Sequence, residues 1–278
     1  MMSLTIGPFS LSWERLLIFL SLAVAFIVGA LVTKKENISI DTSIIKIFLV
    51  AMLAARIGFV IRYWSEYQTS IWSMIDIRDG GFDGPTAIVV GTLVFIGLLS
   101  RKPQGRAALF KACMAGMLVW SLAKITLSVI EDRSQQLPSA IVHSLRGEPI
   151  NLNQLEAGRP RVINLWATWC PPCRREMPVL AQAQQQMKDI GFVFVNQGDH
   201  AAVIELFLQQ EELLLDNIMV DPMGVIGYQI GSRALPTTLF VNARGQLVGA
   251  HLGELSRATL KAKLEKLKLL DETKVNNE

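Results

Sequence analysis

Long apolar runs in the first half of this 278-residue chain limit most strongly what it can fold into. Four such runs carry few charges: 16–32, 44–63, 86–99 and 107–130. Inside a bilayer only helices and closed barrels satisfy their backbone hydrogen bonds, and a spanning helix needs about 20 apolar residues. We therefore expect an α-helical transmembrane bundle of about four spans over residues 1–133. The third run is short, so it either starts earlier or lies tilted.

Charged residues between the runs predict how the bundle is oriented. Lys34 and Lys35 separate the first two runs, and Arg101, Lys102 and Arg106 lie between the last two. The stretch between the second and third runs contains more acidic than basic residues. Because basic loops remain in the cytoplasm, both ends of the bundle are predicted to lie outside. The rest of the chain would then face the extracytoplasmic side.

Two cysteines separated by two prolines, Cys170 and Cys173, dominate the second half. They follow an apolar run typical of a central strand, 161–167, and precede an expected helix, 171–189. Backbone N–H groups and the dipole at a helix N-terminus stabilise a thiolate, the nucleophile of disulfide exchange. Half of a zinc site is the alternative, but the three cysteines and three histidines show no further ligand spacing. We predict a redox-active disulfide, with no metal and no other cofactor.

The second half also alternates between strand and helix patterns, which predicts an α/β sheet sandwiched by helices. A polar stretch ending at Pro138 indicates a linker, placed at 134–143, before a domain at 144–278. Besides 161–167 and 171–189, the expected strands are 191–196, 237–241 and 246–251, and the expected helices are 200–212 and 256–270.

The run from Asn164 to Pro178 resembles the active-site segment of TlpA-like and ResA-like thioredoxins. Asp221–Gly224 and Leu235–Val241 resemble a later part of the same family, so the likeness covers roughly 144–270. The resemblance implies a thioredoxin fold and a membrane-tethered, extracytoplasmic thiol–disulfide oxidoreductase. In that family the proline of the later segment is cis and faces the cysteine pair, a role implied here for Pro236. Substrate-groove positions would be Trp169, Leu235 and Thr237.

The resemblance also implies where a proton acceptor lies. Typical thioredoxins carry a buried acid where this chain has Asn164, and an amide cannot accept a proton. TlpA-like proteins have a glutamate three residues after the second cysteine, and Glu176 matches it. Burial would raise the pKa of this carboxyl and let it exchange protons near the dithiol. Alternatively, Glu176 is an ordinary acidic residue favoured by the helix dipole.

Three segments of the first half resemble, in order, prolipoprotein diacylglyceryl transferase: Ile6–Trp13, Ala55–Tyr63 and Arg78–Gly84. Those enzymes move diacylglycerol from phosphatidylglycerol to a lipobox cysteine. The family's Trp-Tyr-Gly reads here Trp13-Glu14-Arg15, and its Phe-His-Gly-Gly reads Phe82-Asp83-Gly84-Pro85. Because the tyrosine and histidine are absent and the module is about half the family's length, we expect transferase chemistry to be lost.

Two residues within the apolar runs need separate interpretation. Arg56 matches a position of the transferase family and is a weak candidate for binding a lipid headgroup, with snorkelling to the surface as the alternative. Cys113 lies among small residues in the fourth run, where it is expected to pack. A single cysteine offers no thiol pair inside the membrane.

These observations predict a multi-pass protein of the bacterial inner membrane whose thioredoxin-like domain faces the periplasm. The leading hypothesis is a protein-disulfide reductase acting through Cys170 and Cys173. Its partners would be extracytoplasmic protein disulfides, the lipid bilayer and a separate membrane thiol conduit as electron donor. A net charge of +3 requires no nucleic acid. The alternatives are a dithiol oxidase, or a lipid-binding, lipoprotein-binding or transferase-like protein with a fused redox domain.

Overall fold

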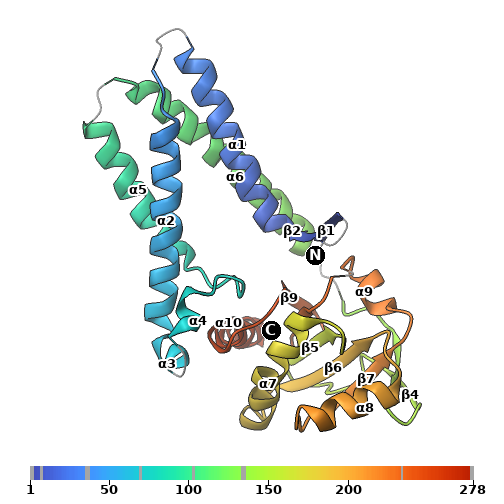
Figure 1. The fold of residues 1–278 in the computed structure, drawn as a ribbon. Helices are drawn as coiled ribbons and strands as arrows, with labels where there is room; N and C mark the ends of the chain where they lie inside the picture. Colours follow the sequence, from blue (N-terminus) through green and yellow to red (C-terminus); the bar gives the residue numbers. More distant parts are fainter. Residues whose placement is uncertain are drawn as a thin grey trace. The chain divides into compact units, whose positions relative to one another are not determined.

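A computed structural model describes residues 3–6, 9–34, 38–68, 71–101, 104–132, 136–232 and 234–275. The chain divides into two compact units (Figure 1). The helical unit comprises 13–130, and the sheet unit comprises 1–12 and 131–278. Part of the predicted basic loops, Lys35 and Lys102, and residues 134–135 of the predicted linker lie outside the described residues.

Four long helices form the helical unit: α1 (Trp13–Thr33), α2 (Asp41–Arg62), α5 (Gly84–Arg101) and α6 (Arg106–Asp132). Two short helices, α3 (Trp64–Tyr67) and α4 (Trp72–Ile75), lie between α2 and α5. All four long helices are long and apolar enough to cross a membrane. This confirms the expected bundle. The third helix starts two residues earlier than its apolar run and extends over 18 residues, about 27 Å.

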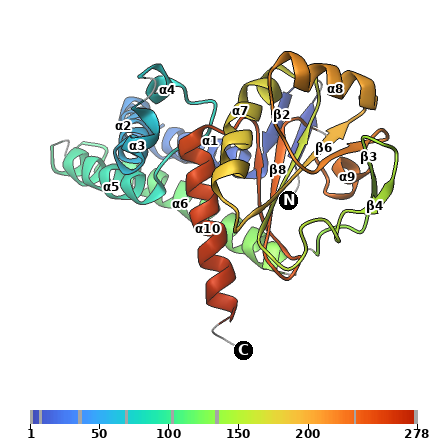
Figure 2. The same ribbon diagram turned by 90° about the horizontal axis from the view of Figure 1, so that it is seen from below.

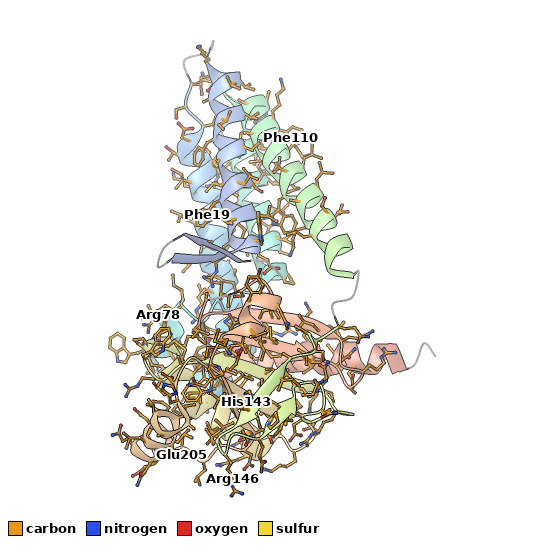
Figure 3. The ribbon with its side chains drawn as sticks, turned by 90° about the vertical axis from the view of Figure 1, so that its right-hand side faces the viewer. Phe19, Arg78, Phe110, His143, Arg146 and Glu205 are labelled. Atoms are coloured by element: carbon orange, nitrogen blue, oxygen red, sulfur yellow. A yellow bond between two sulfur atoms is a disulfide. The ribbon has the colours of Figure 1, made fainter. Side chains whose placement is uncertain are left out.

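Small residues allow the long helices to approach one another closely. A Cβ added at Gly116 of α6 would lie 2.8 Å from the carbonyl oxygen of Ser21 in α1. A Cβ at Gly58 of α2 would lie 2.7 Å from Oγ1 of Thr86 in α5. Cys113 is partly buried and packs against an apolar cluster that includes Ala112. Larger side chains such as Phe19 and Phe110 are exposed on the helix surfaces, as expected for lipid-facing positions (Figure 3).

A seven-stranded mixed sheet forms the centre of the sheet unit, in the order β4-β3-β7-β6-β5-β8-β9. Strands β5, β6 and β7 are mutually parallel, whereas β8 runs antiparallel to β5. The strands are β3 (Ile141–Ser144), β4 (Pro149–Asn151), β5 (Arg161–Trp166), β6 (Gly191–Gln197), β7 (Ile218–Asp221), β8 (Thr237–Val241) and β9 (Leu247–Leu252). The helices are α7 (Pro171–Gln186), α8 (Ala201–Gln210), α9 (Val225–Gln229) and α10 (Arg257–Val275).

Alternate residues of β5 serve two different cores, because successive side chains of a strand point to opposite faces. Val162 and Trp166 pack in the cluster formed with α7, α8 and α10. Ile163 and Leu165 pack in a second cluster that includes α9 and residues before β5. Figure 2 shows α7 and α10 on one side of the sheet and α9 on the other. Helices on both faces of this sheet confirm the expected α/β thioredoxin fold.

The structure differs from the sequence prediction at several short elements. Strands β3, β4 and β7 and helix α9 were not predicted, because each spans only three to five residues and shows little periodicity. Strand β3 begins inside the predicted linker 134–143, and Leu137 is already buried in the second core cluster. Only the start of that stretch can therefore act as a linker. An additional hairpin, β1 (Ser3–Ile6) with β2 (Phe9–Ser12), precedes α1.

Replacing glycine by alanine should have opposite effects on thermal stability at two positions of the helical unit, Gly116 and Gly97. Gly116→Ala should lower the thermal midpoint of the detergent-solubilised chain, because the new methyl group meets the backbone of α1. Gly97→Ala should raise the midpoint slightly, because nothing lies within 4 Å and alanine is favoured over glycine in helices by about 1 kcal/mol. Equal shifts for the two variants would contradict the close packing of α1 and α6.

Candidate active site

The two cysteines of the central motif form a closed disulfide at the start of α7, with an S–S length of 2.05 Å. Cys170 is the N-cap residue, and the backbone N–H of Cys173 donates to its Sγ (3.3 Å). Pro171 and Pro172 occupy the first helical turn, where no N–H is required. After reduction, a thiolate at Cys170 would meet the same N–H and the positive end of the helix dipole.

Hydrogen bonds to a residue just after the neighbouring strand β6 fix the loop that carries Trp169. Asp199, just after β6, accepts hydrogen bonds from the backbone N–H of Thr168 (2.8 Å) and from Nδ2 of Asn196 (2.9 Å). Trp169 itself is 67% exposed beside the buried Cys170, which leaves an aromatic surface next to the disulfide. Sequence reasoning missed Asp199, because an Asp just before a helix suggests an ordinary helix cap.

Glu176 lies fully buried one helical turn after Cys173 on the same face of α7. Its Oε1 accepts a hydrogen bond from Nδ2 of Asn164 (2.7 Å), and its Oε2 accepts one from the backbone N–H of Leu255 (2.9 Å). Burial raises the pKa of this carboxyl to about 8, against the opposing effect of the two hydrogen bonds. The environment therefore favours a neutral acid that can take up or release a proton near neutral pH.

Pro236 lies at the same end of the inner strands β5 and β8 as the disulfide. The Leu235–Pro236 peptide bond is cis, as the resemblance implied. Strand β8 begins directly after it and runs antiparallel to β5, with Thr237 opposite Leu165. The start of β8 therefore meets the end of β5, from which the chain continues to Cys170.

The other two predicted groove positions differ in their surroundings. Leu235 is partly buried and packs against both core clusters. Thr237 is buried, and its hydroxyl donates to the carbonyl of Ala234 (2.6 Å). The hydroxyl of Thr237 thus stabilises the chain before Pro236, and the groove position of Thr237 stays a prediction.

The loop between β9 and α10 joins these parts of the site. The backbone N–H of Gly253 donates to the carbonyl of Pro236 (3.0 Å), two residues before the Leu255 N–H that binds Glu176. Between them, Glu254 accepts from Nε (2.8 Å) and a terminal nitrogen (2.6 Å) of Arg175. Gly253 has a φ of +104°, a conformation that favours glycine. No sequence signal marked this loop as part of the site.

Arg56 of the helical unit does not have the surroundings of a headgroup ligand. Its five N–H groups all donate within the chain, so the predicted lipid contact at Arg56 is corrected. Asp79 accepts at 3.0 Å and Gly81 O at 2.8 Å, and both residues lie beyond α4. The remaining acceptors are the carbonyls of Met74, Ser73 and Asp76. The guanidinium is buried and its hydrogen-bonding capacity is used up.

Asp83 occupies the position where the transferase motif has its histidine. Its carboxylate accepts from the backbone N–H (3.0 Å) and the hydroxyl (2.6 Å) of Thr86, at the start of α5. Such an arrangement caps the helix. The residue at this position is thus used for local structure, in agreement with the expected loss of transferase chemistry.

Glu176 gives a pH-dependent stability that can be measured. Its pKa rises on folding from 4.5 to about 8, so within that window only the folded state keeps the proton. Stability of the oxidised protein should therefore fall as pH rises from 4.5 to 8. Glu176→Gln, which cannot titrate, should gain stability relative to the parent over this range, by at most about 1.4 kcal/mol per pH unit.

Urea unfolding at several pH values measures this difference, with the exposed Glu205 on α8 as the control site. Glu205→Gln should follow the parent profile. If Glu176→Gln also followed it, the carboxyl would titrate normally in the folded state.

Gly253 provides a separate test of the loop between β9 and α10. Gly253→Ala should lose about 1–3 kcal/mol through backbone strain. It should also shift the pH dependence of alkylation of reduced Cys170. Gly147→Ala, at an exposed glycine that also has a positive φ, should lose stability without that shift. An unchanged alkylation profile for Gly253→Ala would show that the loop does not influence the cysteines.

Comparison with known proteins agrees with this division of the chain. Residues 133–267 match the Redoxin family, and residues 1–124 match the Prolipoprotein diacylglyceryl transferase family. The thiol-disulfide oxidoreductase ResA of Halalkalibacterium halodurans is 30% identical over 136 residues, which cover 48% of this chain and 76% of the relative. The thioredoxin-like protein YneN of Bacillus subtilis is 27% identical over 167 residues, covering 57% and 95%.

Among solved structures, MTB dsbF is 25% identical, with a TM-score of 0.42 and coverage of 48% of this chain and 96% of that chain. The disulfide, Glu176 and the cis proline all lie within residues 133–267, which match the Redoxin family. The chain therefore belongs to the ResA-like thiol-disulfide oxidoreductases, with their redoxin domain joined to a module of the prolipoprotein diacylglyceryl transferase family.

Proposed function

We propose that this oxidoreductase is a membrane-anchored protein-disulfide reductase of the extracytoplasmic space. The observation that carries the proposal is the Cys170–Cys173 disulfide at the N-terminus of α7, one turn before a buried carboxyl with a pKa of about 8. This arrangement combines a thiol that is readily deprotonated with a group that can exchange a proton near neutral pH.

The reaction starts from the reduced dithiol. The Cys170 thiolate attacks one sulfur of a substrate disulfide, and the other substrate sulfur leaves as a thiolate that takes up a proton. A mixed disulfide between Cys170 and the substrate results. The backbone N–H of Cys173, which donates to Cys170 Sγ, supports the attacking thiolate. The exposed Trp169 beside it provides an apolar surface for the substrate.

Cys173 then resolves the mixed disulfide. When Glu176 is in its ionised form, the Cys173 thiol passes its proton to this carboxylate, and the resulting thiolate attacks Sγ of Cys170. The second substrate sulfur leaves as a thiolate, so the substrate gains two electrons while the Cys170–Cys173 disulfide forms. Burial of Glu176 on the same face of α7 as Cys173 supports this proton path. Pro236 lies directly before β8, at the end of the sheet where the disulfide also lies, and would position an extended substrate segment.

Regeneration requires two electrons from another protein. The whole sequence has three cysteines, and Cys113 is the one that lies in the helical unit. A dithiol relay through those helices would need a pair. A separate membrane thiol conduit is therefore the proposed donor, and protein disulfides outside the cytoplasm are the proposed substrates.

Four apolar helices support anchoring in a bacterial inner membrane. The described basic residues Lys34, Arg101 and Arg106 flank the ends at which α1 leads to α2 and α5 leads to α6. By the positive-inside rule these ends face the cytoplasm. An even number of spans then returns the chain to the outside before the sheet unit begins, so the disulfide would face the periplasm.

A dithiol oxidase with the same residues is the main alternative, and the reduction potential separates the two. The full chain carrying Cys113→Ala, in detergent, would be equilibrated with dithiothreitol or glutathione buffers. We expect a potential near or below that of thioredoxin, about −270 mV. A value near −120 mV would mark an oxidant and reverse the proposed electron flow.

A lipid-binding, lipoprotein-binding or transferase function is the remaining alternative. The internal bonding of Arg56 and the capping role of Asp83 argue against it. Transfer of labelled diacylglycerol from phosphatidylglycerol to a lipobox peptide by the full chain would support it nonetheless.

A further inference from the structure

The segment between α2 and α5 folds into a compact structure that the redox chemistry does not use. The described residues of this segment, 63–68 and 71–83, are here called the cap. It contains the short helices α3 and α4. Both of its ends are tied to long helices: Tyr63 follows α2 directly, and the N–H of Asp83 donates to the carbonyl of Ala55 (2.9 Å).

One group of polar side chains at the cap is buried around Arg56. Arg56 donates from α2 to three carbonyls within or near α4, to Gly81 and to the Asp79 carboxylate. Asp79 also accepts from the hydroxyl of Tyr67 (3.4 Å), and the Arg56 guanidinium lies 5.6 Å from the centre of the Tyr67 ring. Arg56, Tyr67 and Asp79 are all buried. A buried ion pair with saturated hydrogen bonds fixes one geometry, because losing either partner would leave a buried charge.

The apolar side chains of the cap point outward. Five large apolar residues are between 53% and 81% exposed: Trp64, Ile71, Trp72, Ile75 and Ile77. A short water-facing loop does not ordinarily leave this many large apolar side chains exposed together. Apolar surface exposed to this extent in one short segment indicates a partner that is itself apolar.

The exposed surface of the cap continues that of the spanning helix. Ile57 and Ile61 lie one turn apart on α2, Trp64 begins α3 two residues after the end of α2, and all three are at least half exposed. Helix α2 has 22 residues and is about 33 Å long, close to the roughly 30 Å of the hydrocarbon layer. Its C-terminal end therefore reaches the membrane surface, and the cap starts there. Tryptophan is the residue most suited to that depth, with an apolar body and one N–H donor.

We propose that the cap lies in the headgroup region of the bilayer, with Trp72, Ile71 and Ile75 inserted among the lipids. This inference rests on the proposal that the helical unit spans the membrane. The partner is the outer leaflet at the C-terminal end of α2, and the Arg56–Asp79 pair holds the cap in the shape that presents these side chains. In this position the residue matched to the transferase family has become a structural support for a membrane anchor.

Site-specific labelling of the full chain in liposomes tests the proposal. Cys113→Ala, Cys170→Ser and Cys173→Ser remove the native thiols, and Trp72→Cys or Ile75→Cys then receives an environment-sensitive fluorophore. Two reference labels accompany them: Leu53→Cys, exposed in the middle of α2, and Glu205→Cys, exposed on α8 of the sheet unit. The quenchers are aqueous iodide and lipids that carry a nitroxide either near the headgroup or at the end of the acyl chain.

We expect the labels at 72 and 75 to be quenched most by the headgroup nitroxide, the label at 53 most by the acyl-chain nitroxide, and the label at 205 by iodide. Arg56→Lys, with fewer donors, should reduce lipid quenching at 72 and leave the label at 53 unchanged. Iodide quenching of 72 and 75 equal to that of 205 would overturn the proposal. So would protection from iodide without lipid quenching, which would mean that protein covers the cap. Failure of lipid quenching at 53 would instead contradict membrane spanning itself.

Discussion

A single buried carboxyl group, that of Glu176, determines how the parts of the redox site meet. One of its oxygens is bonded to Asn164 on the central strand β5, and the other to the backbone of Leu255 in the loop between β9 and α10. The same loop binds the carbonyl of Pro236. Because an unpaired buried carboxyl is costly, these elements must all be in place for the site to form, and the disulfide lies one turn away on α7.

Each unit has an ionisable side chain that is buried, Glu176 in the sheet unit and Arg56 in the helical unit. The two units compensate the cost of burying these side chains in different ways. Glu176 has two neutral hydrogen-bond donors and no cationic partner among the described residues, so burial moves its pKa into the neutral range. Arg56 has a carboxylate partner at 3.0 Å and four carbonyl acceptors, which satisfy every donor. The first arrangement leaves a group able to exchange a proton, as a catalyst requires. The second suits a structural support.

The sequence predicted what depends on composition and local pattern. The four apolar runs became α1, α2, α5 and α6, and the strand–Cys–Pro–Pro–Cys–helix order became β5 and α7. Short elements were missed, because a strand of four residues such as Ile218–Asp221 is too short to show a recognisable alternation of apolar and polar residues. Asp221 belongs to a recognised motif, yet its carboxylate serves to bond the first N–H groups of α9. Arg56 was misread, since its acceptors lie up to 25 residues away.

By itself the sequence determined the two-part organisation, the four long apolar helices, the redox pair and the position of the acid beside it, because each follows from residues adjacent along the chain. Only the tertiary structure decided the surroundings of those groups. The high pKa of Glu176 requires β5 and the loop near Gly253 to close over it, and the saturation of Arg56 requires the cap to fold back onto α2. Burial and hydrogen-bond partners come from residues distant in the chain, and these set proton affinity and available donors.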